Sequence, residues 1–400
     1  MAETLPEATP LPMTRPADRP FDPPPELAKT REGHPLSRLL YPDGHVGWLV
    51  TSHALARRVL ADPRFSSRSE LLHIPYPGGL GEKLPPAPPG HLHAMDPPEH
   101  TRYRQMLTGR FTVRRMGMLT AQIERFTGEI LDAIAKQGPP ADLVQAFAYS
   151  IPALTICELL GVPAEDHEKF QHEARMMNAL DVAPEEVYAA YVAMDKYVRE
   201  LVVAKRADPT DDLLSDLTKT DLSDEELAGI GTVLLGAGLD TTANMLAIGV
   251  FALLRHPAQL AALRDDPGLV DGAVEELLRY LTVVHTNAKT ALEDVELDGH
   301  LIEAGDTVTI SLHAANRDPE RFPDPDTLDL GRRAVGHVTF GHGIHQCLGQ
   351  QLARVEMRVA FRELLSRFPT LRLAVDPDEV PVHVSAVYSA QRLPVTWDEA

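Results

Sequence analysis

The feature that most constrains the fold is one long helical stretch, Asp224 to Arg255. Ser223 and Glu226 have the spacing of a capping box at its start. His256-Pro257 marks its end, because the residue before a proline is disfavoured in helical conformation. A helix of roughly 30 residues at 1.5 Å per residue extends for about 48 Å. The sequence therefore predicts a long central helix.

Most of the remaining chain is also expected to be helical, with a smaller share of strands. Apolar residues at helical spacing predict helices over 111–134, 141–160, 183–204 and 348–368. Short strands are expected at Trp48–Val50, within 290–312 and in the tail, with Thr307–Ile310 as the clearest case. The fold class is mainly α with a small β portion (α+β), and residues 26–400 are expected to form one catalytic domain.

Two segments rich in proline interrupt this pattern. Residues 1–25 combine proline with polar residues and predict a loose N-terminal arm. Residues 69–95 form a proline-laden loop, and a loop of this length in a compact protein is usually functional or disordered. We interpret it as a lid or gate over a binding site.

Charge and cysteine usage exclude several classes of protein. A formal net charge of −20 and a sequence pI of about 5.2 argue against a nucleic-acid partner. The two cysteines, Cys157 and Cys347, lie far apart, which disfavours a disulfide framework and indicates a reducing compartment. The sequence has no run of about 18 apolar residues and no signal-peptide pattern. A cytoplasmic protein with no membrane partner is therefore expected.

The strongest chemical signal surrounds Cys347, in the ten residues from Phe340 to Gly349. Gly341 and Gly343 allow a tight loop whose backbone can approach a flat ligand. The cysteine follows this loop and precedes a helix, whose N-terminal N–H groups favour a thiolate. A zinc site is disfavoured, since no second cysteine lies nearby. Cys157 lies in an apolar run, where a buried, inert thiol is expected.

This decapeptide resembles the haem-binding loop of the cytochrome P450 family, and the resemblance extends from about Pro35 to Trp397. The resemblance implies the fold of that family, with the long helix over haem b bound non-covalently. It assigns Cys347 as the axial thiolate ligand of the iron, a ligand that donates electron density and promotes O–O cleavage. Further haem contacts are implied for Ala237, Phe340, His345 and Gly349, with Phe340 beside the sulfur and His345 towards a propionate.

In the long helix, Ala237–Thr242 resembles the oxygen-activating segment of the family. Small residues fit there if haem and O₂ lie against the helix, although glycine within a helix costs about 1 kcal/mol relative to alanine. A threonine hydroxyl can also bond back to a carbonyl and open the helix locally. The resemblance implies catalytic roles for Asp240 and Thr241, with Asp240 relaying protons.

Three further groups of residues match the family pattern. His100 and Arg104 are spaced i,i+4 on one helix face, where they are expected to hold a propionate. Glu276 and Arg279, spaced i,i+3, and Arg332 match a structural ion-pair group, in which buried charges must be paired. At Lys289 the related sequences usually have arginine, and lysine keeps the charge but loses the bidentate fork.

The resemblance implies a haem-dependent monooxygenase that inserts one oxygen atom from O₂ by hydroxylation or epoxidation. Its substrate is expected to be a bulky lipophilic small molecule, such as a macrolide or another polyketide secondary metabolite, held by a mostly apolar pocket. The sequence has no dinucleotide-binding motif, so electrons are expected from a separate ferredoxin or flavodoxin and its reductase. A basic patch including Arg102, Arg110, Arg114, Arg115, Arg354 and Arg358 is expected to bind that acidic donor.

Three alternatives remain open from the sequence. The same haem fold can perform oxidative coupling or ring formation, including on a carrier-bound substrate. A haem protein that only binds or senses has no need for the Asp240-Thr241 pair. A metal-free cysteine hydrolase would need a histidine to activate Cys347, and His345 is the candidate nearest in sequence.

Overall fold

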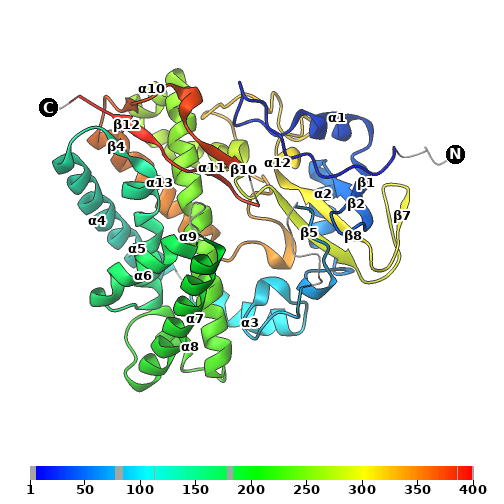
Figure 1. Cartoon of the computed structure of the whole chain (residues 1–400), viewed down its shortest axis with the longest axis horizontal. Coiled ribbons are helices and arrows are strands. Elements are labelled where there is room, and N and C mark those ends of the chain that lie inside the picture. The colour runs from blue at the N-terminus through cyan, green and yellow to red at the C-terminus, as the bar shows by residue number, and fades with distance from the viewer. Residues whose placement is uncertain (1–5, 77–83, 112, 178–182, 385, 399–400) are drawn as a thin grey trace.

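The structure of the chain is a computed structural model that describes residues 6–76, 84–111, 113–177, 183–384 and 386–398. Helices dominate it, and Figure 1 shows most of them gathered on one side of the molecule with the main sheet on the other. The α-helices are α1 (Pro25–Gly33), α2 (His53–Ala61), α3 (Glu99–Thr108), α4 (Val113–Gln137), α5 (Ser150–Leu160), α6 (His167–Met177), α7 (Pro184–Ala207), α8 (Leu213–Leu217), α9 (Asp224–Arg255), α10 (Pro257–Asp265), α11 (Val270–Leu281), α12 (Leu312–Ala315) and α13 (Gln350–Arg367).

The strands are short and form one main sheet and three small ones. The main sheet has the order β1-β2-β8-β5-β3, with β2 parallel to β8 and the other neighbours antiparallel. The strands are β1 (Leu36–Leu40), β2 (Val46–Val50), β3 (Phe65–Ser66), β4 (Ala141–Asp142), β5 (Thr286–Ala291), β6 (Val295–Leu297), β7 (His300–Ile302), β8 (Thr307–Ser311), β9 (Arg372–Leu373), β10 (Val382–Val384), β11 (Tyr388–Ala390) and β12 (Pro394–Thr396).

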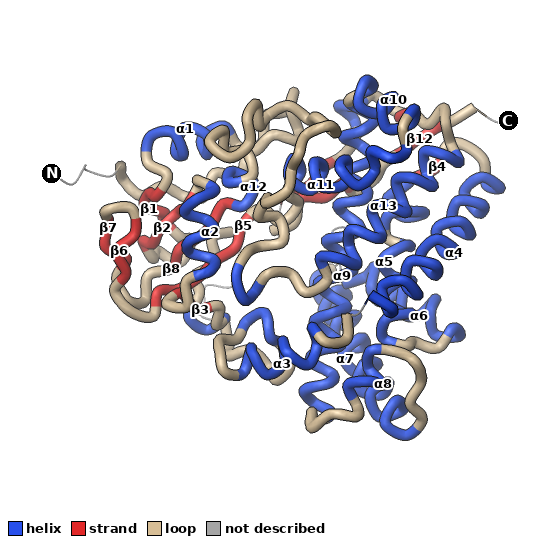
Figure 2. Tube along the Cα trace, turned by 180° about the vertical axis from the view of Figure 1, so that it is seen from behind, coloured by secondary structure: helices blue, strands red, loops and turns tan. Residues whose placement is uncertain are grey.

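The long helix α9 is the centre of the helical part, as the sequence predicts. It begins with the capping box of Ser223 and Glu226 and ends at Arg255, before His256. Helices α5, α7, α10, α11 and α13 all contact it, and so does strand β11. Seen from behind in Figure 2, α13, α4 and α5 lie side by side next to α9. Most of α9 is buried, and in its middle only Gly236 and Ala237 are exposed.

Local structure differs from the sequence prediction at two places that matter for the site. Residues 144–148, expected within one α-helix, form a single π-helical turn before α5 begins. Strand β5 begins at Thr286, so Lys289 lies inside a strand paired with β8 and not ahead of it. The neighbours of Lys289 in the sheet explain its burial.

The described part of the N-terminal stretch is packed against the domain, which corrects the expectation of a loose arm. Thr9 bridges to Leu39 of β1, and Leu11 and Phe21 are buried. The guanidinium of Arg15 lies 3.9 Å from the ring centroid of Tyr388. Apolar residues among the prolines provide this packing, so residues 6–25 are part of the fold.

Candidate active site

The loop before α13 is folded tightly around two glycines. Gly341 and Gly343 have φ angles of +70° and +77°, which disfavour residues with a side chain. A Cβ at Gly343 would lie 2.6 Å from the carbonyl oxygen of Leu60, so the loop also packs closely on the end of α2. The N–H of Cys347 donates to the carbonyl oxygen of Phe340 over 2.8 Å and closes the loop. The predicted glycine roles are thus visible in the geometry.

The thiol of Cys347 is largely buried, although the residue as a whole retains exposed surface. Burial raises the pKa of the Cys347 thiol. The backbone N–H groups of Gly349 and Gln350 and the charges of Arg104 and Arg354 oppose that rise. Those N–H groups belong to the first turn of α13, as expected for a thiolate at a helix N-terminus. Among the described residues, His345 makes no hydrogen bond to Cys347.

Four basic side chains from α3, β5 and the cysteine loop lie close enough to act on one another: His100, Arg104, Lys289 and His345. Both ring nitrogens of His100 are buried without a hydrogen-bond partner. The ring of His345 lies 4.2 Å from that of His100, centroid to centroid. Arg104 has no ion-pair or hydrogen-bond partner in the described ranges, and Lys289 donates to the hydroxyl of Ser67.

The electrostatics of these four groups favour binding of an anion. Burial lowers the pKa of each of them, to about 8 for Lys289 and about 2 for His345, and their mutual repulsion adds to the shift in His100 and His345. Buried polar groups need partners, and buried cations need negative charge. The two propionates of haem have the required charge, so the residues present fit the cofactor that the resemblance implies.

The middle of α9 has an accessible face. Gly236 and Ala237 are exposed, although the helix around them is mostly buried. One turn further, the hydroxyl of Thr241 donates to the carbonyl oxygen of Ala237 over 2.7 Å, the back-bond that the sequence predicts. Asp240 is half-buried, and its carboxylate accepts hydrogen bonds from Tyr149 and Asn244, both over 2.9 Å.

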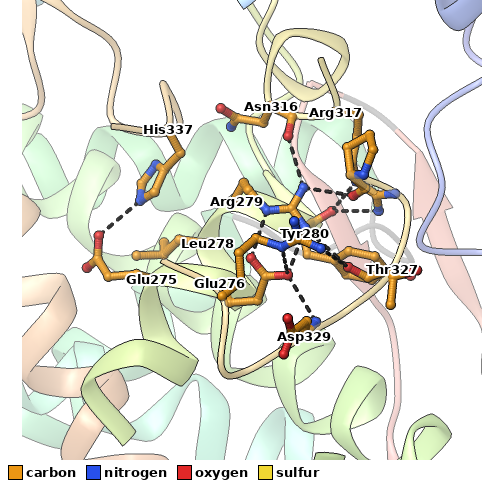
Figure 3. Close-up of polar contacts among 12 residues, drawn as sticks. Glu275, Glu276, Leu278, Arg279, Tyr280, Asn316, Arg317, Thr327, Asp329 and His337 are labelled. Atoms are coloured by element: carbon orange, nitrogen blue, oxygen red, sulfur yellow. Dashed lines mark hydrogen bonds and ion pairs between the residues drawn. The ribbon is translucent and has the colours of Figure 1, made fainter. Parts of the chain in front are cut away.

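The structure brings together the predicted ion-pair group of Glu276, Arg279 and Arg332, shown in part in Figure 3. Arg279 donates to both carboxylate oxygens of Glu276, over 2.7 Å and 2.8 Å, and both side chains are 0 % exposed. Arg332 donates to the same carboxylate over 3.1 Å. Arg279 also donates to the carbonyl oxygen of Asn316, whose side chain accepts the N–H of Val338 at the base of the cysteine loop. The group therefore supports that loop.

Sequence reasoning missed a second carboxylate that holds the loop. Glu275 pairs with His337 over 3.2 Å and with Arg354 of α13 over 2.5 Å, and so connects α11 to both ends of the cysteine segment. In the sequence, only its position next to Glu276 could have indicated this role of Glu275. Burial alone would raise the pKa of Glu275, but the hydrogen bonds from His337 and Arg354 prevail and lower it from 4.5 to about 2.

We expect the Glu275→Gln variant to be less stable than the parent protein by about 2 kcal/mol near pH 7. The folded-state pKa of Glu275 is lowered, so its contribution is present above the unfolded pKa of about 4.5 and is lost as pH falls towards 2. The difference should therefore shrink below pH ~4.5. Urea unfolding followed by circular dichroism from pH 7 to pH 3 measures it. A difference independent of pH would contradict this role.

Comparison with known proteins decides the family. A family model described as Cytochrome P450 matches residues 159–383. The chain is 47% identical over 395 residues to Cytochrome P450 105C1 of Streptomyces sp, covering 98% of this chain and 100% of that protein. The chain belongs to the cytochrome P450 family. It groups with the CYP105 members of that family from actinomycetes, and its cofactor is therefore haem.

Solved structures agree with this placement. The crystal structure of GfsF, a P450 of Streptomyces halstedii, has a TM-score of 0.92 at 42% identity, covering 98% of this chain and 100% of that one. CYP105P1 in complex with filipin I has a TM-score of 0.91 at 40% identity, with the same coverage. The predicted P450 fold is confirmed, and the chain is a cytochrome P450 monooxygenase.

The central helix of this P450 also resembles a membrane span in length and composition. Of the described helices it alone passes that test, and 72% of its apolar window is buried inside the protein. Burial against α5, α7 and α13 accounts for its apolar character, as for the core helix of a globular domain.

Proposed function

We propose that Cys347 is the axial ligand of haem b in this P450, and that His100, Arg104, Lys289 and His345 hold the propionates. The observation that carries this assignment is a cysteine just before the start of α13 beside four basic side chains, among which both ring nitrogens of His100 are buried without a hydrogen-bond partner. When bound, haem supplies the activation of O₂ and the transfer of one oxygen atom to the substrate. The protein supplies orientation, proton delivery and exclusion of water.

The residues of α9 are proposed to deliver protons. The Thr241 hydroxyl uses its own proton to bond the carbonyl of Ala237, so its oxygen lone pairs face the accessible side and can accept a hydrogen bond there. Asp240 is the nearest acid in sequence, and its carboxylate accepts hydrogen bonds from Tyr149 and Asn244. Burial raises the pKa of Asp240 and so moves it towards the pH at which a carboxyl group can both give and take a proton.

The substrate is proposed to be a bulky lipophilic secondary metabolite such as a polyketide, altered by hydroxylation or epoxidation. Three segments meet near the start of β5, since Val284 bridges to Val387 and the hydroxyl of Tyr76, in the predicted 69–95 lid, lies 2.5 Å from that of Thr286. Leu80, in the same predicted lid, lies outside the described residues. CYP105P1, a structural relative, is known in complex with filipin I, which supports a large apolar ligand.

A separate ferredoxin or flavodoxin, with its reductase, is the proposed electron donor. The six arginines predicted to form its docking patch all have partners within the protein: Arg102, Arg114, Arg115, Arg354 and Arg358 form ion pairs, and Arg110 donates to backbone carbonyls. Ile344 is exposed on the cysteine loop itself, and the charge of Arg57 acts on His342 there. These two features support a docking surface for the donor beside Cys347.

Replacing Thr241 with alanine should lower the amount of product formed per electron pair by at least about tenfold, because one proton-delivery group is lost. Substrate-dependent NADH use, peroxide release and product are measured together with the donor system in excess. Thr232→Ala is the matched control, since Thr232 lies on the same helix but is buried. Unchanged coupling in Thr241→Ala would remove the role proposed for Thr241.

A further inference from the structure

The carboxylate of Asp240 is held by two neutral donors. The phenol of Tyr149 donates to Oδ1 over 2.9 Å, and the side-chain amide of Asn244 donates to the same oxygen over 2.9 Å. The amide also donates to the backbone carbonyl of Asp240 over 3.0 Å. Asn244 lies one turn after Asp240 on the same helix, whereas Tyr149 comes from a different part of the chain. The carboxyl group of Asp240 is therefore oriented by these hydrogen bonds before any substrate binds.

Two unusual local features lie where Tyr149 reaches α9. It directly follows the π-helical turn at 144–148, which contacts α9, and π-helical turns are frequent at functional sites. Two residues before Asp240, Gly238 lets the Ile156 side chain of α5 pack against α9, since a Cβ at Gly238 would lie 2.7 Å from Cδ1 of Ile156. The Tyr149 phenol, at the end of the π-helical turn, reaches the acid.

Asp240 is otherwise poor in charged neighbours. Within the described ranges no lysine, arginine or histidine forms an ion pair with it. The groups that act on it are the phenol of Tyr149 from the α5 side and the amide of Asn244 on α9. Burial raises the pKa of Asp240, and these two hydrogen bonds oppose the rise. Burial and Asp240 in turn raise the pKa of Tyr149, which keeps its proton.

We propose that Tyr149 is a positioning residue for the Asp240 carboxyl group. The Tyr149 phenol and the Asn244 amide fix the orientation of that carboxyl group and set the pH range in which it exchanges protons. This inference rests on the proton-delivery role proposed for Asp240. A hydrogen bond stabilises the charged form of the acid that accepts it, so losing the phenol favours the protonated form. The phenol thus keeps Asp240 able to release a proton near neutral pH.

The test is Tyr149→Phe in the haem-loaded enzyme. The pH at which Asp240 is half-protonated should rise by about one unit, as expected for one hydrogen bond to a charged group. It is measured by ¹³C NMR of labelled aspartate carboxyls in the ferrous, carbon-monoxide-bound protein, with Asp240→Asn identifying the signal. The limb of the pH profile of product formation that Asp240 controls should move in the same direction by the same amount.

Tyr197→Phe is the matched control. The Tyr197 phenol also donates to an aspartate, Asp166, over 2.8 Å, but on α7 and away from Asp240. This variant should leave both the Asp240 signal and the pH profile unchanged. Haem content and the carbon-monoxide spectrum show whether each variant is folded. Should Tyr149→Phe not fold, Asn244→Ala removes the second donor and should move the same midpoint upward.

The outcomes separate the two proposals. An Asp240 midpoint equal to that of the parent protein in a folded Tyr149→Phe variant would overturn the inference about Tyr149. A shifted Asp240 midpoint with an unchanged pH profile of product formation would also overturn it, because the protonation of Asp240 would then have no effect on product formation. Full coupling in Asp240→Asn would instead refute the delivery role itself.

Discussion

Replacing Cys347 with serine should abolish the red-shifted Soret band of the reduced, carbon-monoxide-bound protein and lower product formation by more than about a thousandfold, or about 4 kcal/mol in the barrier. Serine preserves the size of the side chain and the hydrogen bonds from Gly349 and Gln350. It removes the thiolate, whose electron donation promotes O–O cleavage. Absorption spectra and product analysis of the purified variant measure both effects.

Cys157→Ala is the control for this prediction. Cys157 is fully buried in α5, where burial raises the pKa of its thiol and keeps it protonated and inert. Its replacement leaves only a small cavity and should retain the thiolate band. Retention of that band by Cys347→Ser, or its loss in a folded Cys157→Ala variant, would refute the ligand assignment.

The sequence was sufficient for features that depend on local spacing. The capping box at Ser223, the glycine loop before Cys347 and the back-bond of Thr241 all involve residues within a few positions of one another. Each follows from backbone geometry and hydrogen bonding that the residue types themselves specify. For the same reason the Glu276-Arg279 pair was predictable within α11, whereas the contact of Arg332 with it rested on the resemblance.

Features that depend on packing between distant segments were not predictable. Tyr149 lies 91 positions from Asp240, and Arg354 lies 79 from Glu275, so no periodicity connects either pair. The N-terminal stretch was expected to be loose from its composition, but Leu11 and Phe21 find apolar partners that only the folded domain provides. In each case tertiary contacts outweigh local preference, which is why the fold class was easier to predict than the details of the site.

Replacing Arg279 with alanine should destabilise the protein by about 3–5 kcal/mol, because the buried Glu276 carboxylate would keep only Arg332 and the N–H of Asp329 as partners among the described residues. That is a large part of the roughly 5–15 kcal/mol that stabilises a typical domain. The loss also removes the hydrogen bond to the carbonyl of Asn316, which supports the cysteine loop. Haem content should therefore fall together with the midpoint of urea unfolding.

Arg358→Ala provides the comparison, since Arg358 pairs with Asp271 over 2.9 Å at the surface. An exposed pair contributes about 0–1 kcal/mol, so this variant should unfold close to the parent midpoint and keep its haem. A combined Glu276→Leu and Arg279→Leu variant tests the cause. Removing both charges avoids the unpaired carboxylate, so it should recover part of the stability lost in Arg279→Ala. If the double variant is no more stable, the damage comes from lost hydrogen bonds to Asn316 and Pro325 and not from the buried charge.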